Sequence, residues 1–318
     1  ATYMDVQPAQ RKKNIVILGA GFGGIACALR LERLFRTKRT LFGNFAIVLV
    51  DRRNFHLWTP ALYDVATTAS DDASPLNIKK AVTIPVEEIT AKKRIVFLQG
   101  KVLKVNIAQK QITFDDETVL EYAYLVFALG SEPAHFGIPG VKEHSISLKG
   151  LDDAIHIRST IRKKYDEKRE GGEVAVVIGG GGPTGVEFAA ELTGYLRELN
   201  RKHSKGEHVA VTLIEGAPSI LPGFDQWTIR KATERLTSLG VHLKTGHLVA
   251  RADSRTVYVK SSTDAPEEGV LCDVFIWSGG VQAVNVMSSG DLSLEKRGRF
   301  ETDPSMTCIS PDKHLDVA

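Results

Sequence analysis

The stretch NIVILGAGFGG, residues 14–24, decides the fold. Residues 14–18 form a short apolar run, which is typical of a buried parallel strand. Apolar residues at helical spacing follow over 25–35, and a second apolar run over 45–50 ends at Asp51. A strand, a glycine-rich turn, a helix and a strand in this order predict a βαβ unit that binds a dinucleotide.

The same pattern starts again near residue 174. Residues 174–178 predict a strand, 179–185 a glycine-rich turn, 186–199 a helix, and 209–214 a strand that ends at Glu215. A shift of 161 residues superposes Gly19, Gly21 and Gly24 on Gly180, Gly182 and Gly185. The repeat predicts an α/β fold with two Rossmann-like dinucleotide-binding domains, the second inserted in the first.

Each loop has the chemistry that a pyrophosphate requires. The first glycine allows the tight turn, the second lets the backbone approach the phosphates, and the third lets the helix pack against the strand. The acids that follow, Asp51 and Glu215, can bind an adenosine ribose, although they lie 27 and 30 residues beyond the last glycine rather than about 20. A single loop of this kind is also compatible with a plain tight turn, but two in register favour nucleotide binding. Because the Glu215 carboxylate repels a 2′-phosphate, NADH is expected rather than NADPH.

Composition excludes several classes of protein. The 318 residues carry 41 Lys and Arg against 38 Asp and Glu, a net charge of +3 that does not suggest a nucleic-acid partner. The three cysteines, Cys27, Cys272 and Cys308, are too far apart for a CxxC or CxxxxC redox pair. The nine histidines are scattered, no metal-binding motif is present, and no metal site is expected. His56 is the histidine of interest, because it lies inside an aromatic segment.

The remaining segments complete the expected organisation. Residues 52–90 are too irregular for a regular element and too apolar for a plain surface loop. Alternating residues predict strands over 94–128, and helices are expected from about Leu151 and over 226–239. Further strands are expected near 241–260 and 273–277, and 285–318 is rich in loops.

Several segments resemble the type II NADH dehydrogenases, which are single-subunit flavoprotein NADH:quinone oxidoreductases. They are NIVILGAGFGGIACALRLERL from residue 14, IVLVDRRNFHLWTPALYDVATTAS from residue 47, YLVFALGSEPAHFGIPG from 124, VIGGGGPTGVEFAAEL from 177, TLIEGAPSILPGFD from 212 and WSGGV from 277. The resemblance runs from about residue 14 to 318, and residues 54–69 are its most specific part. It implies FAD in the first loop and NADH in the second, with a hydride passing to the flavin and two electrons onward to a quinone, without proton pumping.

The resemblance also assigns residues to the flavin. Asp51 takes the FAD ribose, Arg52 and Arg53 lie near the adenosine, and Thr59 and Pro60 lie near the isoalloxazine. The other implied contacts come from the first glycine loop, from the residue where the backbone meets the adenine, and from the position of a common Ala-Thr-Gly turn. These are Gly19, Gly21, Phe22, Gly23, Gly24, Val102, Ala128 and Gly130. Leu129 departs from the Ala-Thr-Gly pattern.

The implied NADH residues come from the second loop and the end of the last strand. They are Gly180, Gly182, Pro183, Thr184, Gly185, Glu215, Gly279 and Gly280. Glu187, which replaces Ala26 of the first repeat, has two interpretations. It stabilises the start of the helix through the helix dipole, or it acts in catalysis by facing the nicotinamide or the reacting edge of the flavin.

The expected domains are a FAD-binding domain over 14–145, an NAD-binding domain over 146–284 and an incomplete return to the first over 285–318. In the family, the segment that resembles 314–318 continues into the end of the flavin site, the quinone site and membrane-anchoring helices. The resemblance therefore implies a peripheral protein on the cytoplasmic face of the membrane, with this chain as a soluble part, and leaves a homodimer open. The alternatives are a non-catalytic dinucleotide-binding module, a sulfide:quinone reductase and an NADH-dependent reductase of an iron–sulfur protein.

Overall fold

The computed structural model describes residues 12–68, 75–168, 173–202, 210–284, 292–296 and 298–309, without the side chains of 39 and 75–78. The chain divides into two units. Unit 1 is drawn from residues 1–57, 83–132 and 282–318, and unit 2 from 58–82 and 133–281. The second unit is therefore inserted in the first, as the sequence predicts.

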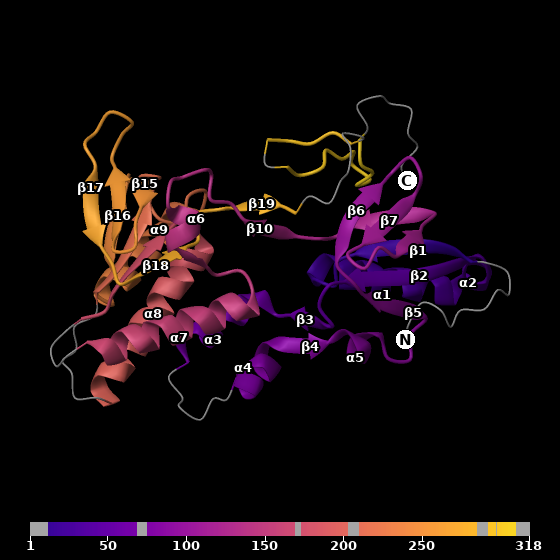
Figure 1. The fold of residues 1–318 in the computed structure, drawn as a ribbon, viewed down its shortest axis with the longest axis horizontal. Helices are drawn as coiled ribbons and strands as arrows, with labels where there is room; N and C mark the ends of the chain where they lie inside the picture. Colours follow the sequence, from indigo (N-terminus) through magenta and orange to yellow (C-terminus); the bar gives the residue numbers. More distant parts are fainter. Residues whose placement is uncertain are drawn as a thin grey trace. The chain divides into compact units, whose positions relative to one another are not determined.

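Unit 1 contains a four-stranded parallel sheet with the strand order β5-β2-β1-β9 (Figure 1). Its strands are Lys13–Leu18 (β1), Phe45–Asp51 (β2), Ile95–Gln99 (β5) and Tyr124–Phe127 (β9). Helices α1 (Phe22–Thr37) and α2 (Arg39–Asn44) connect β1 to β2. The predicted βαβ unit is confirmed. The sequence did not predict α2, which occupies part of the extra length before Asp51.

The central strands β1 and β2 are buried on both faces of this sheet, which explains why they are continuous apolar runs. Ile15, Ile17 and Leu49 face a cluster that includes Ala28 and Phe35 of α1. The alternate residues face an antiparallel sheet made of Val102–Asn106 (β6), Gln111–Phe114 (β7) and Val119–Glu121 (β8). Figure 1 shows α1 and β6–β7 on opposite sides of β1 and β2.

Two short strands and a helix complete the regular structure of unit 1. Phe55–Leu57 (β3) pairs antiparallel with Thr83–Pro85 (β4), and Val86–Thr90 (α5) follows. The Val86 N–H donates to the Asn54 carbonyl at 2.9 Å, which fixes the end of this ribbon. Strand β3 follows directly after the turn that leaves β2, and its pairing with β4 holds it there.

Unit 2 repeats the architecture. Its parallel sheet has the order β11-β18-β12-β13-β14, from Ile146–Ser147 (β11), Val274–Trp277 (β18), Ala175–Gly179 (β12), Ala210–Glu215 (β13) and His242–Thr245 (β14). An antiparallel sheet follows, from Leu248–Ala252 (β15), Thr256–Lys260 (β16) and Glu268–Leu271 (β17). Its helices include Val141–His144 (α6), Leu151–Glu167 (α7), Pro183–Lys202 (α8) and Gln226–Ser238 (α9). The predicted restart near residue 174 is confirmed.

The segment over 52–90, for which the sequence predicted no regular element, contains several short ones. Besides β3, β4 and α5, it forms a 3-10 turn at Thr59–Ala61 (η2) and helices Leu62–Thr67 (α3) and Pro75–Val82 (α4). Helix α3 contacts α7 and α8, and Figure 1 shows it beside them. Leu62, Val65 and Ala66 are buried. The prediction of an irregular segment was wrong because these turns depend on packing against distant helices rather than on periodicity.

Two paired strands, Ser131–Pro133 (β10) and Val281–Ala283 (β19), carry the chain between the units. The units divide at 132/133 and 281/282, and 58–82 belongs to unit 2. The sequence instead placed the boundaries after 145 and 284 and kept 58–82 with the flavin domain. Among the described helices, none combines the length and apolar character that a bilayer span needs. The expected return over 285–318 is described only in part, as bridges such as Leu294 with Phe300.

Candidate dinucleotide and flavin site

The first glycine loop follows β1 directly and can be formed only with glycine at two positions. Gly19 has a φ of 104°, and a Cβ there would overlap the Ala128 carbonyl. A Cβ on Gly24 would overlap the carbonyl oxygen of Gly19. These overlaps are the tight turn and the close helix-to-strand packing that the sequence predicts for this loop.

The second loop repeats this construction in unit 2. Gly180 has a φ of 110°, and a Cβ there would lie 2.6 Å from Gly279. A Cβ on Gly185 would overlap the Gly180 carbonyl and lie 2.8 Å from the Ser278 hydroxyl. That hydroxyl also donates to the carbonyls of Gly179 at 3.1 Å and Gly180 at 3.0 Å. The loop is therefore held against the end of β18.

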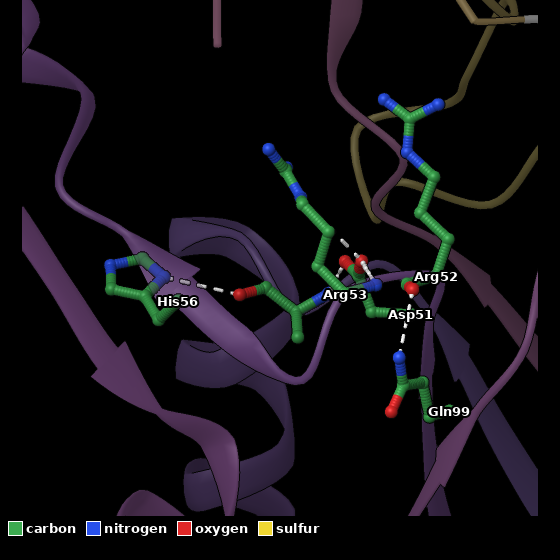
Figure 2. Close-up of polar contacts among 6 residues, drawn as sticks. Asp51, Arg52, Arg53, His56 and Gln99 are labelled. Atoms are coloured by element: carbon green, nitrogen blue, oxygen red, sulfur yellow. Dashed lines mark hydrogen bonds and ion pairs between the residues drawn. The ribbon is translucent and has the colours of Figure 1, made fainter. Parts of the chain in front are cut away.

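The acids at the ends of β2 and β13 hold the loops themselves. Asp51 accepts hydrogen bonds from the N–H groups of Ala20 at 2.7 Å and Arg53 at 2.9 Å (Figure 2). Glu215 accepts from Gly181 at 2.7 Å and Ala217 at 2.8 Å. A carboxylate has about four acceptor sites, so each acid can also accept from ribose hydroxyls.

Both loops leave space where a phosphate would bind. A Cβ on Gly21 or Gly182 meets nothing within 4 Å, and the same holds for Gly23. Gly21 caps α1 without a side-chain hydrogen bond, and neither α1 nor α8 has an acid in its first turn. The first N–H groups and the positive end of each helix dipole therefore face no competing carboxylate of that turn. These features fit the pyrophosphate of a dinucleotide in each unit.

The other residues expected to contact FAD in unit 1 surround the first loop. Phe22 is the first residue of α1 and is 47% exposed. Gln99 donates to the Arg52 carbonyl at 3.3 Å, and the Arg53 guanidinium lies 4.0 Å from the Asp51 carboxylate. Figure 2 shows both arginines around Asp51. Val102 begins β6 and packs against the core of the unit.

Ala128 and Gly130 follow β9 beside this loop. The Ala128 N–H donates to the Leu18 carbonyl at 2.8 Å, and the Ser278 N–H makes the same bond with Gly179 at 2.8 Å in unit 2. Gly130 has a φ of 73°, which favours glycine. The end of β9 is therefore fixed beside Gly19, and Leu129 offers no hydroxyl.

A cavity of about 320 Å³ opens in unit 2 beside the second loop. The sequence predicted five of its lining residues as site residues, namely Thr59, Pro60, Thr184, Glu187 and Gly280. The lining residues that it did not predict are Leu62, Tyr63, Pro133, Ser147, Leu148, Lys149, Trp277, Ser278 and Val281. The packing of α3 on α7 and α8 brings Thr59 and Pro60 to this cavity.

The start of α8 corrects one interpretation of Glu187. The helix begins at Pro183, earlier than the predicted residue 186. Glu187 therefore lies beyond the first turn, where the helix dipole has little effect. Its exposed side chain lines the cavity instead. This position leaves the carboxylate able to contact a ligand.

Two further ionisable side chains line the cavity. Burial raises the pKa of Tyr63, and the nearby Asp64, Glu187 and Glu191 raise it further. Burial lowers the pKa of Lys149. The cavity therefore combines a carboxylate, a phenol and a half-buried ammonium group. The sequence signal for Tyr63 is its place in the aromatic segment over 54–69. Lys149 has no such signal, because it follows β11, a strand of two residues that is too short to produce a period.

The structure offers nothing for disulfide or metal chemistry in the part it describes. All three cysteines are free thiols, and burial raises the pKa of each. The described residues contain no cluster of three or more potential metal ligands. The candidate sites are therefore the first glycine loop with Asp51 in unit 1, and the second glycine loop with Glu215 and the cavity in unit 2.

Comparisons with known proteins agree with this architecture. The type II NADH:quinone oxidoreductase of Staphylococcus aureus is 26% identical over 305 residues, which cover 94% of this chain and 72% of that protein. The structure of NDH2 from Plasmodium falciparum in complex with NADH matches with a TM-score of 0.74 at 24% identity, over 86% of this chain and 56% of that one. The sulfide:quinone oxidoreductase of Aquifex aeolicus matches with a TM-score of 0.69 at 20% identity, over 86% and 60%.

The resemblance to type II NADH dehydrogenases is thus confirmed, and this chain spans little more than half the length of the solved structures it matches. The two-domain α/β fold is confirmed as well. The model of the pyridine nucleotide-disulphide oxidoreductase family matches residues 13–312. The chain belongs to that family.

Proposed function

We propose that this protein is an FAD-dependent NADH:quinone oxidoreductase that does not pump protons. The main support for the proposal is the cavity beside the second glycine loop, because Glu187, Thr59 and Pro60 all line it. The name of the Staphylococcus aureus relative, which aligns with 94% of this chain, supports the quinone as acceptor. Free, widely separated cysteines support an acceptor other than a disulfide.

FAD is assigned to the proposed flavin domain over 14–145 with its return over 285–318, whose glycine loop lies in unit 1. Asp51 binds the adenosine ribose, and Arg52, Arg53 and Val102 lie around the adenosine. The pyrophosphate lies on the helix start, against Gly19, Gly21, Phe22, Gly23 and Gly24, with Ala128 and Gly130 beside it. The open space at Gly21 supports this assignment.

NADH is assigned to unit 2, in the proposed NAD domain over 146–284. Glu215 binds its ribose and disfavours a 2′-phosphate, and Gly279 and Gly280 lie near the nicotinamide. The pyrophosphate lies against Gly180, Gly182, Pro183, Thr184 and Gly185. Pro183 suits this place, because the first position of a helix needs no N–H donor.

When bound, FAD supplies the redox chemistry: it accepts a hydride from NADH and passes two electrons to the quinone. The chain binds the two nucleotides and orients them. Glu187 would face the nicotinamide and contribute a polar group that orients the ring, and Thr59 and Pro60, which line the same cavity, would lie near the isoalloxazine. Because quinones dissolve in membranes, we propose that the whole protein works as a peripheral protein at the cytoplasmic face.

The test is NADH oxidation by the FAD-loaded protein with and without a water-soluble quinone. Glu187→Ala removes the polar group that orients the ring, so it should lower kcat by about tenfold or more and leave NADH affinity within about threefold. Glu198→Ala, on the same helix but outside the cavity, is the matched control. Purified protein without flavin absorbance would favour the dinucleotide-binding module. Reduction of the quinone by sulfide rather than by NADH would favour the sulfide:quinone reductase, and oxidation of NADH only with an iron–sulfur protein as acceptor would favour the reductase of such a protein.

A further inference from the structure

Two side chains bind the backbone of Ala20, the residue between the first two glycines of the first glycine loop. We call this loop, residues 19–24, loop 1 and its equivalent in unit 2, residues 180–185, loop 2. The Ala20 N–H donates to the Asp51 carboxylate at 2.7 Å, and the Ala20 carbonyl oxygen lies 3.1 Å from Nδ1 of His56. Figure 2 shows the His56 ring directed at this oxygen, with Asp51 on the other side. His56 is one of the few buried polar side chains among the described residues.

Its surroundings hold the His56 ring in place. His56 lies in β3 and pairs with Ile84 of β4. Its ring meets the Phe22 ring edge to face, with centroids 4.7 Å apart and planes at 86°. Only 6% of the residue is exposed. Backbone pairing and an aromatic contact thus limit the ring to an orientation in which Nδ1 reaches Ala20.

The second loop satisfies the equivalent groups differently. The Gly181 N–H donates to the Glu215 carboxylate at 2.7 Å, as Ala20 does to Asp51. The Gly181 carbonyl, however, accepts from the backbone N–H of Leu221 at 2.7 Å. The donor to the loop carbonyl is therefore a backbone group in unit 2 and a histidine in unit 1.

A carbonyl oxygen only accepts, so His56 must carry a proton on Nδ1. The neutral Nδ1–H form and the imidazolium both satisfy this requirement, so the bond does not depend on charge. The peptide that joins Ala20 to Gly21 is planar and trans, which directs its N–H opposite to its carbonyl. Holding the carbonyl toward His56 therefore directs the Gly21 N–H away from His56 and fixes the peptide plane that enters α1.

We infer that His56 is a positioning residue for the flavin loop: its Nδ1–H holds the Ala20–Gly21 peptide in the orientation that receives the FAD pyrophosphate. The inference rests on the proposed function in one respect, namely that FAD binds loop 1. Without the donor, the buried carbonyl loses a partner and the loop becomes mobile. Loop 2 keeps its backbone donor, so NADH binding is an internal control.

The test compares His56→Asn, His56→Gln and His56→Leu, with the exposed His156→Leu as control. The Asn amide nitrogen can take the place of Nδ1, the Gln amide reaches the place of Nε2, and Leu has no donor. FAD affinity of the apoprotein is measured by quenching of flavin fluorescence. We expect His56→Leu and His56→Gln to raise the FAD Kd at least about tenfold, which corresponds to about 1.4 kcal/mol. His56→Asn and His156→Leu should stay within about threefold, with the NADH Kd unchanged throughout.

Amide hydrogen exchange of the apoprotein gives a second measurement that does not need FAD. Exchange in the peptide that covers Ala20 and Gly21 should speed up in His56→Leu and return to normal in His56→Asn, with no change around Gly181. Wild-type affinity or wild-type exchange in His56→Leu would overturn the inference. If that variant does not fold, equal FAD affinity of His56→Asn and His56→Gln would overturn it. If wild-type protein binds no FAD, the proposed function fails, and the exchange experiment still decides the role of His56.

Discussion

Substitution of single loop glycines by alanine separates two roles that a glycine motif combines. In unit 1, Gly24 has no space for a side chain, because a Cβ would overlap the Gly19 carbonyl. Gly21 has space, because a Cβ there meets nothing within 4 Å. We therefore expect Gly24→Ala to damage the fold and Gly21→Ala to damage only ligand binding.

The expected magnitudes follow from these contacts. In Gly24→Ala the Cβ would lie closer to backbone than 3.0 Å, so the helix or the strand must shift. Overpacking of this kind costs about 3 kcal/mol or more. For a domain of this size that lowers Tm by roughly 6–12 °C. Gly21 has φ of −78° and ψ of −168°, which alanine adopts without strain. Its loss as a helix cap of up to about 1 kcal/mol is offset by a gain of about 0.4–1 kcal/mol from a less flexible unfolded chain.

The assay combines thermal unfolding of the apoprotein with titration of FAD. Gly21→Ala should keep the wild-type Tm within about 2 °C and raise the FAD Kd by about tenfold or more, because its methyl group occupies the space of the pyrophosphate. Gly182→Ala should do the same to NADH and leave FAD binding unchanged. Wild-type FAD affinity in Gly21→Ala would refute the placement of the pyrophosphate, and a wild-type Tm in Gly24→Ala would refute the steric argument.

Three further measurements test other parts of the structure. Glu215→Ala removes the carboxylate that repels a 2′-phosphate, so the ratio of kcat/KM for NADPH to that for NADH should rise about tenfold; an unchanged ratio would contradict the assignment of Glu215. Burial raises the pKa of Tyr122 from 10 to about 12. The contribution of this tyrosine to stability is therefore complete below pH 10 and is lost as the pH rises toward 12. Absorbance at about 295 nm should show that Tyr122 ionises together with alkaline unfolding, and its ionisation near pH 10 in the folded protein would contradict this prediction. Burial, with Asp273 and Asp253, raises the pKa of Cys272 to about 11, so iodoacetamide should modify this thiol slowly at neutral pH until denaturant is added.

The sequence predicted the parts of the fold that local pattern determines. Continuous apolar runs identified β1, β2, β12, β13 and β18, because strands buried on both faces need apolar residues at every position. The glycine loops and their acids followed from spacing. The short elements α2, α3 and β11 were not predicted, since six residues or fewer give too few turns or alternations to produce a period.

The cavity could not be predicted from the sequence for a different reason. Thr59 follows β3 of unit 1 after one residue, but α3 packs on α7 and α8 and brings the segment into unit 2. Lys149 and Glu187 reach the same cavity from segments far apart in the chain. The approach of these residues to one another depends on tertiary packing, which the periodicity of the sequence does not reveal. Only the resemblance to known flavoproteins connected Thr59 and Pro60 with a flavin.

The two loops share glycine where a Cβ would overlap the backbone, and the helices that follow them differ at exposed positions. Gly24 and Gly185 are equivalent, and a Cβ on either would overlap the carbonyl of the first glycine. Two positions further along each helix, Ala26 and Glu187 are both exposed, and nothing in the loop constrains them. The shared contacts therefore explain why each loop is able to take a pyrophosphate, but not which dinucleotide it takes. That distinction must come from the exposed differences, and the carboxylate of Glu187 in the cavity is the difference that can act on the reactive end of the nucleotide.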